Sequence, residues 1–319
     1  MKFESQVVLH DGKLDCSQLF ADAKAIVDKE KEKLGVKRLD RGHMLQHLIN
    51  STSAGYLSPT AMKSFMQCPA NYVIQKVTPR DIRAATTIGS AYHKIMELWY
   101  SEDKENRTED RIYAIADEFI KKENQEENKD DIYYYIKNYL KSEDYLGGKM
   151  KHEQLDCSTE QFFKSVVYPL GVKLPAKVYC LVDRIDFRDD GIYVIDYKTG
   201  RGATNDYIIN GYLPQMIFYK WVVEAEIGEK IKDVYLCSPG DSENPYVKMN
   251  VNSLVEQSKV IDNCFEFLEQ GRAMKKDRVY ETRRMTYCAS CPLSNICSKY
   301  NKEIKDSEYF VYDVKIDVD

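Results

Sequence analysis

The stretch from residue 181 to residue 198 places the strongest limits on what this chain can fold into. It consists of two segments rich in β-branched and aromatic residues, joined by an Asp-Asp-Gly sequence. Asp-Gly between two such segments is a strong signal for a tight β-hairpin. If Asp190 and Gly191 form the loop, counting back along both arms places Asp183 opposite Lys198.

Three charged side chains should share one face of this hairpin. Because side chains alternate along a strand, Asp183, Asp196 and Lys198 point the same way, with Asp196 diagonal to Asp183. Two carboxylates at the end of an apolar stripe repel each other and lose hydration unless a cation compensates. Mg²⁺ or Mn²⁺ suits such oxygen ligands. A solvated hairpin end, with Lys198 in a surface ion pair, explains the pattern equally well. The apolar residues expected on this face as part of the core are Ile185, Phe187, Ile192 and Val194.

Composition narrows the class of protein without choosing an activity. The chain has 319 residues, enough for one large domain or two small ones. It contains no apolar run of the roughly 18 residues that a membrane span needs, and its start lacks the apolar core of a signal peptide. We therefore expect a cytoplasmic protein with no membrane partner. The net charge of −5 means that DNA binding would need a local basic patch. Residues 272–284 are the best candidate, although such runs are more often solvated surface.

The spacing of the cysteines is more informative than their number. A cytoplasmic location argues against disulfides. Cys288, Cys291 and Cys297 lie within ten residues and can converge on one centre, for which Cys68 is the candidate fourth ligand. Four thiolates suit zinc or an iron–sulfur cluster. A close triplet with one distant cysteine favours the cluster, while zinc and the absence of any metal remain open. The other cysteines are isolated and are read as structural thiols: Cys16, Cys157, Cys180, Cys237 and Cys264.

Hydrophobic periodicity along the chain predicts one α/β domain with helical additions. The helices are expected at about 16–50 with a stop at Gly35, 58–77, 87–100, 107–126, 129–141, 206–226 and 252–272. The strands are expected at about 150–156, 161–168, 177–188, 192–198, 231–237 and 245–250, with a further edge strand at 309–318.

Two of these helices carry residues that can serve a metal site. A lone helical histidine is usually an ordinary packing residue, but a neutral His93 could complete an oxygen-rich site. On the helix after the hairpin, Tyr212, Gln215 and Tyr219 share one face. That face could hydrogen-bond a phosphate or orient the lysine of the hairpin. A partly exposed packing face accounts for the same spacing.

Taken in chain order, these motifs resemble the RecB-type branch of the PD-(D/E)XK nucleases over about residues 58–300. The matching segments are Gly89-x-x-x-His93, Val182-Asp183-Arg184-Ile185-Asp186, Asp196-Tyr197-Lys198-Thr199-Gly200 and Tyr212-x-x-Gln215-x-x-x-Tyr219. The position before Asp183, often glycine in that family, is Val182. The four cysteines resemble the iron–sulfur clamp of the AddB subunit and of CRISPR adaptation exonucleases. The resemblance implies a restriction-endonuclease-like core, in which helices flank a central mixed β-sheet.

The resemblance also implies roles for individual residues. His93, Asp183 and Asp196 would bind Mg²⁺ or Mn²⁺ together with the backbone carbonyl of Tyr197. Lys198 would position and help deprotonate the attacking water, or stabilise charge in the transition state. The remaining implied residues are Gln215 and Tyr219, which would support the substrate strand or the lysine, and Cys68, Cys288, Cys291 and Cys297, which would hold a structural 4Fe–4S cluster.

The function implied is that of a metal-dependent DNA exonuclease in DNA repair, recombination or phage and CRISPR DNA processing. The chain has no P-loop motif and therefore no ATPase motor of its own, which favours a standalone exonuclease over a fragment of a helicase–nuclease. A subunit that works with a separate helicase or with a recombination or adaptation partner stays open. The alternatives are a catalytically silent or helicase-associated DNA-binding subunit, and a zinc-stapled scaffold. The expected domains are an N-terminal helical extension (1–57), a nuclease domain (58–300) with a helical insertion (105–145) and an iron–sulfur region (288–297), and a C-terminal tail (301–319).

Overall fold

The structure is a computed structural model that divides into two compact units. Unit 1 combines residues 1–81 with residues 262–319, and unit 2 is the continuous segment 82–261. Parts of the elements expected at 16–50, 58–77, 105–145 and 150–156 lie outside the described residues. The structure describes residues 2–37, 39, 45–46, 49, 56–76, 84–142, 155–200, 206–240, 245–285, 288–305 and 307–317.

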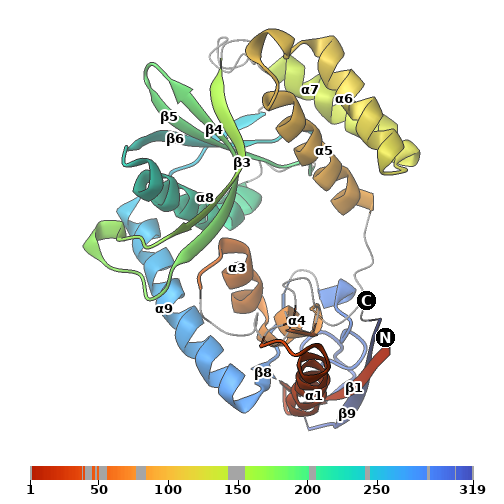
Figure 1. The fold of residues 1–319 in the computed structure, drawn as a ribbon. Coiled ribbons are helices and arrows are strands. Elements are labelled where there is room, and N and C mark those ends of the chain that lie inside the picture. The colour runs from red at the N-terminus through yellow and green to blue at the C-terminus, as the bar shows by residue number, and fades with distance from the viewer. Residues whose placement is uncertain are drawn as a thin grey trace. The chain divides into compact units, whose positions relative to one another are not determined.

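Unit 2 is built on a mixed sheet with the strand order β3-β4-β5-β6-β7 (Figure 1). Strands β5 and β6 pair in parallel, and the other neighbours pair antiparallel. The expected fold class, a mixed sheet flanked by helices, is therefore confirmed. The strands are β3 (Asp156–Ser165), β4 (Val178–Arg188), β5 (Gly191–Tyr197), β6 (Ile231–Cys237) and β7 (Tyr246–Lys248).

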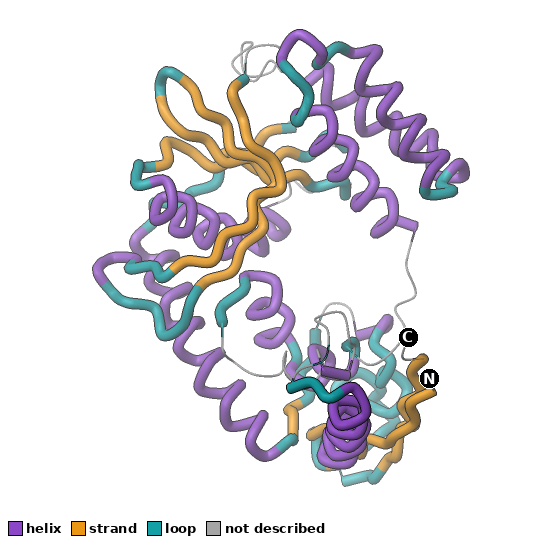
Figure 2. The backbone as a smooth tube through the Cα atoms, in the orientation of Figure 1, coloured by secondary structure: helices purple, strands orange, loops and turns teal. Residues whose placement is uncertain are grey.

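Helices cover both sides of this sheet (Figure 2). A parallel pair of strands needs a crossover connection, and α8 (Asp206–Ile227) makes the one between β5 and β6. On the other side lie α5 (Ala84–Tyr100), α6 (Glu109–Lys122) and α7 (Lys129–Ser142), which pack on Ile195 and Tyr197. The hydroxyl of Thr108 accepts the Arg111 backbone N–H at 3.2 Å and so begins α6. Short 3₁₀ turns occur at Lys104–Asn106, Glu126–Asn128 and Pro169–Gly171.

The β4–β5 hairpin forms as expected, but its register differs from the prediction by two residues. The turn residues are Asp189 and Asp190, and Gly191 already belongs to β5 with a φ of +139°. Only glycine tolerates this conformation readily, so the glycine is needed at the strand end rather than within the loop. Arg184 pairs with Ile195, and continuing this register by one pair places Asp183 opposite Asp196.

A shift of two residues leaves the face of each side chain unchanged, because strands have a period of two. The grouping of the three charged residues therefore survives the correction. Ile185, Ile192 and Val194 are buried, as expected. Phe187 is not, since 41% of it is exposed, and its assignment to the core was wrong.

The two strands expected at 150–156 and 161–168 form one strand in the described part of the chain. Strand β3 runs from Asp156 to Ser165 through Glu160, which has a left-handed backbone with a φ of +48°. Its neighbours Thr159 and Gln161 keep their pairing with β4. The polar sequence before residue 161 made this stretch resemble a break between strands.

Unit 1 contains a second, antiparallel sheet with the order β8-β2-β1-β9. Its strands are β1 (Lys2–His10), β2 (Lys13–Asp15), β8 (Val279–Glu281) and β9 (Phe310–Asp317). The edge strand expected in the tail is confirmed. Strands β1 and β2 were not expected, because residues 1–57 were interpreted as a helical extension. The alternating buried residues Phe3, Val7 and Leu9 give β1 its inner face.

Two helices of unit 1 contact this sheet, one at β1 and one at β8. Helix α1 (Ser17–Leu34) ends at Gly35, as the sequence predicted, with a φ of +65°. The single helix expected at 58–77 is two helices, α3 (Pro59–Gln67) and α4 (Pro69–Ile74), because Pro69 forces Cys68 into an extended conformation. Helix α9 (Leu254–Asp277) starts in unit 2 and ends in unit 1, and a 3₁₀ turn occupies Cys288–Ser290.

Candidate metal centre and cysteine cluster

Three side chains from three elements of unit 2 meet where β3 and β4 pair. His93 comes from α5, Glu160 from β3 and Asp183 from β4. The Nδ1 atom of His93 lies 3.5 Å from Oδ2 of Asp183 and 3.9 Å from Oε1 of Glu160. Three potential ligand atoms, one from each residue, lie within 4.8 Å of one another. An imidazole and two carboxylates at this spacing can hold one metal ion.

The end of β5 supplies the second half of the site. Lys198 forms an ion pair with Asp196 and donates to the Tyr197 carbonyl at 3.2 Å. From α8, the amide of Gln215 donates to Oδ1 of Asp196 at 3.3 Å and to the hydroxyl of Tyr219 at 2.6 Å. Helix α8 therefore holds the aspartate–lysine pair in place.

Glycine at position 89 lets α5 come close to the loop after β5. A Cβ atom on Gly89 would lie 3.1 Å from Oγ1 of Thr199, closer than most such contacts. Because His93 lies one turn further along α5, the same approach brings its ring over the end of β5. The Gly-x-x-x-His motif is thus explained by packing between a helix and the strand end.

The backbone of Tyr197 links the two halves of the site. Its N–H donates to Oδ2 of Asp183 at 2.8 Å, and its carbonyl accepts from Nε2 of His93 at 3.0 Å. A carbonyl can only accept, so Nε2 carries the proton and Nδ1 is the nitrogen free to face the carboxylates. In this arrangement the carbonyl orients the imidazole, as the outer partners of metal-binding histidines usually do.

The side chain of Tyr197 points away from this site into a buried charge network. Arg184 donates to its hydroxyl at 2.7 Å and forms an ion pair with Asp186 at 2.8 Å. Both charged residues are fully buried, and Arg188 donates to Asp186 at 2.7 Å. Asp186 therefore belongs to a structural network on the opposite face of the sheet from Asp183, which faces His93.

The electrostatics of the site favour a bound cation. Burial, together with the nearby charge of Asp196, raises the pKa of Asp183 to about 7, and burial also raises the pKa of Glu160. Burial alone would lower the pKa of Lys198, but Asp196 and Asp183 outweigh it, and the net pKa is raised. The lysine thus stays charged beside these two acids. Mg²⁺ or Mn²⁺ fits this excess of buried carboxylate oxygen.

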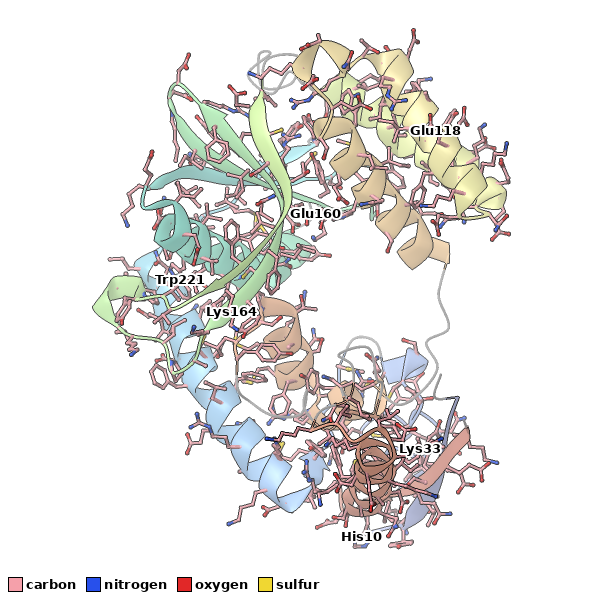
Figure 3. The ribbon with its side chains drawn as sticks, in the orientation of Figure 1. His10, Lys33, Glu118, Glu160, Lys164 and Trp221 are labelled. Carbon is pink, nitrogen blue, oxygen red and sulfur yellow. The ribbon has the colours of Figure 1, made fainter. Side chains whose placement is uncertain are left out.

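Glu160 is the member of this site that sequence reasoning missed. It lay in the gap between two expected strands, so it was assigned to no face of the sheet. The available signal was its distance from the hairpin: an acidic residue in the strand preceding an Asp-bearing strand can reach the same ligand. Figure 3 shows its side chain midway along β3.

The four cysteines of the second motif line one pocket in unit 1. Sγ of Cys68 accepts the backbone N–H groups of Asn71 and Arg283, each at 3.4 Å, and Sγ of Cys288 accepts that of Met285 at 3.2 Å. Backbone donors of this kind stabilise thiolates. The residues that line the pocket include Cys68, Cys288, Cys291 and Cys297.

The thiols in this pocket repel one another once ionised. Burial is the main cause that raises the pKa of Cys291 to about 11, and the other three cysteines add to the rise. None of the cysteines forms a disulfide. The donor set fits zinc or an iron–sulfur cluster, either of which would offset the shared negative charge. The five isolated cysteines lie elsewhere, and four of them are buried: Cys16, Cys180, Cys237 and Cys264.

A comparison with protein-family models identifies the family of this chain. The family model of the PD-(D/E)XK nuclease superfamily matches residues 56–298. The chain belongs to this superfamily. A comparison with curated proteins gives no match. A solved structure titled "Crystal structure of SSO0001" is 13% identical, covers 87% of this chain and 97% of its own, and has a TM-score of 0.34, which is too low to show a shared fold.

Membership settles the general class of protein. The superfamily consists generally of nucleases that act on DNA with divalent metal ions, so the predicted nuclease class is confirmed at that level. Among the described residues, no helix is long and apolar enough to cross a membrane.

Proposed function

We propose that the protein is a Mg²⁺- or Mn²⁺-dependent exodeoxyribonuclease of the RecB type with a structural 4Fe–4S cluster. The observation that carries the proposal is the convergence of His93, Glu160 and Asp183 beside the Asp196–Lys198 pair. Superfamily membership supports nuclease chemistry.

Each residue of the site has a distinct part in hydrolysis. His93, Glu160, Asp183 and Asp196 would hold the ion. The Tyr197 carbonyl, expected as a further oxygen ligand, would join them only by releasing the Nε2–H of His93 that it accepts here. A bound divalent ion polarises the phosphate and lowers the pKa of water. Lys198 holds its positive charge within reach of the phosphate and balances the charge that develops there.

Substrate positioning falls to α8 in this proposal. Gln215 bonds both Asp196 and Tyr219, so the three move as one group. Its amide can turn toward a substrate oxygen when the ion occupies the carboxylates. Tyr212 lies under the ammonium of Lys198, 4.9 Å from ring centroid to Nζ, and keeps the lysine beside the aspartate.

Digestion of end-labelled DNA tests the enzyme proposal. Single- and double-stranded substrates, each labelled at the 5′ or the 3′ end, should be shortened from an end in Mg²⁺ or Mn²⁺ and left intact in EDTA. Asp196→Ala should abolish cleavage, while Asp189→Ala, on the exposed turn of the same hairpin, should retain it. Equal degradation by wild type and Asp196→Ala refutes the assignment. No cleavage by wild type that still binds DNA indicates a catalytically silent subunit.

Anaerobic purification tests the proposed cluster. A Cys₄ iron–sulfur protein is brown and absorbs broadly near ~400 nm. Cys68→Ser should remove this absorbance and destabilise unit 1, because the cluster would otherwise close a loop of about 220 residues. Cys157→Ser, at a half-buried thiol of unit 2, should keep the colour. Stoichiometric zinc in a colourless protein contradicts the cluster.

A further inference from the structure

The segment between Glu160 and Asp183, two of the candidate metal ligands, is unusual in charge. Residues 161–182 contain three lysines and no acidic residue, in a chain where 51 of 319 residues are Asp or Glu. Glu160 immediately precedes the segment and Asp183 immediately follows it. Both ends of this basic stretch therefore adjoin the candidate metal centre.

In the structure this segment is a hairpin arm made of the later half of β3, a loop at 166–177 and the first half of β4. Phe162 pairs across the strands with Leu181, and Lys164 pairs with Tyr179. The rings of Phe162 and Tyr179 lie 5.9 Å apart, and Nζ of Lys164 lies 5.1 Å from the Tyr179 ring centroid. These contacts place all four side chains on one face, which we call the arm face.

The arm face is open to solvent. Phe162 is 64% exposed and Leu181 is 48% exposed, although both lie in regular strands. The loop adds an exposed aromatic ring, Tyr168, and two exposed lysines, Lys173 and Lys177. Exposed apolar residues gathered in this way mark an interaction surface rather than a core.

We propose that the arm face binds the unpaired strand of the DNA substrate and leads it to the metal centre. This inference rests on the proposed function. Exposed aromatic rings stack on the faces of unpaired bases, and lysines between them neutralise the backbone phosphates. A duplex hides those base faces within its own stack, so the surface discriminates in favour of a single strand.

The closeness of the arm face to the metal centre and its positive charge favour a DNA strand over a protein partner. Glu160 and Lys164 are both labelled on β3 in Figure 3, four residues apart, which is about 13 Å along a strand. In the basic run at 272–284, the Arg283 guanidinium is already engaged within unit 1, since it donates to the Met66 carbonyl at 3.1 Å and to Gln270 at 3.0 Å. The arm face adds exposed aromatic rings to its lysines and adjoins the candidate metal centre, and we therefore place the proposed strand-binding surface there.

Fluorescence anisotropy of labelled oligonucleotides in EDTA tests the inference without cleavage. Phe162→Ala should weaken binding of a poly-dT strand tenfold or more and leave the weaker duplex binding nearly unchanged. Replacing Lys164, Lys173 and Lys177 with Gln should reduce the slope of log K against log salt by about 2, at about 0.7 for each phosphate contact. The matched controls are Tyr134→Ala and Lys122→Gln, an exposed aromatic ring and an exposed lysine on α7 and α6.

The outcomes separate this inference from the proposed function. Normal single-strand binding by the arm variants, with cleavage intact, refutes the arm and leaves the nuclease standing. Lost binding in the arm variants, with no cleavage by wild type, keeps the arm and refutes the nuclease. If Phe162→Ala weakens the binding of single strands and duplexes equally, base stacking on the arm is refuted. If the wild-type arm binds a protein but no DNA, the unpaired DNA strand is refuted as its ligand.

Discussion

Replacing Asp183 by asparagine should stabilise the metal-free protein at neutral and alkaline pH. The carboxyl is almost fully buried beside Asp196, and both burial and that charge raise its pKa from 3.8 to about 7. In the unfolded chain the same carboxyl ionises freely near pH 4. Between about pH 4 and pH 7 the folded state therefore holds a proton on this carboxyl that the unfolded chain has already released.

The sign and size of the effect follow from linkage. Since the folded pKa is raised, the stabilising proton uptake is fully present below about pH 4 and is lost as the pH rises through 7. A difference of about three pH units, at about 1.4 kcal/mol each, makes this loss about 4 kcal/mol above pH 7. Asparagine avoids the loss and can still accept the Tyr197 N–H at its side-chain oxygen.

Urea unfolding followed by tryptophan fluorescence measures this effect in unit 2 alone, because both tryptophans, Trp99 and Trp221, belong to it. In EDTA, the Asp183→Asn variant should exceed wild type by about 1.4 kcal/mol at pH 5 and by about 4 kcal/mol at pH 8.5. Added Mn²⁺ should stabilise wild type and leave the variant unchanged. The control Asp189→Asn, on the exposed turn, should follow wild type. Parallel pH profiles of Asp183→Asn and wild type would refute the reasoning.

Three further substitutions probe the site and its support. Glu160→Gln should weaken Mn²⁺ binding about tenfold or more, measured by calorimetric titration, and unchanged affinity would remove this residue from the ligand set. Tyr197→Phe leaves the buried guanidinium of Arg184 without one acceptor and should cost about 1–3 kcal/mol in urea unfolding, whereas a wild-type midpoint would show that the bond contributes nothing. Gly191→Ala forces a Cβ to 3.0 Å from Lys232 Cβ at a φ of +139°; it should cost about 1–3 kcal/mol, and an unchanged melting temperature would contradict the strain.

The charged face of the central hairpin was predictable because strand periodicity is insensitive to a two-residue error in register. Asp183, Asp196 and Lys198 meet despite a turn placed at the wrong residues. The hairpin turn itself depends on the φ of Gly191, and Asp-Gly alone does not reveal whether the glycine ends the loop or begins the strand. The stop of α1 at Gly35 was predictable, since a glycine after a periodic helix commonly takes that conformation.

What the sequence could not show depended on contacts between distant residues. Glu160 reaches the site because its own backbone is left-handed within the strand, a conformation that local propensity does not favour for glutamate. Strand β2 has three residues and exists because Lys13 to Asp15 pair with β1 and β8. The proposed strand-binding face of the arm was not anticipated from the sequence, because its exposed side chains come together only when β3 and β4 pair.

The pairing of β1 with β9 sets the order in which the protein can be assembled during synthesis. Unit 2 is continuous in sequence, so it can fold while the last residues are still being translated. Unit 1 cannot be completed until β9 is synthesised, because β1 pairs with β9. The three cysteines that share a pocket with Cys68 begin about 220 residues later in the chain, a delay of about 10–40 s at ribosomal speeds. In the proposed iron–sulfur protein, loading of the cysteine pocket would thus be a late step of biogenesis, and Cys68 would stand apart from the other three thiols until then.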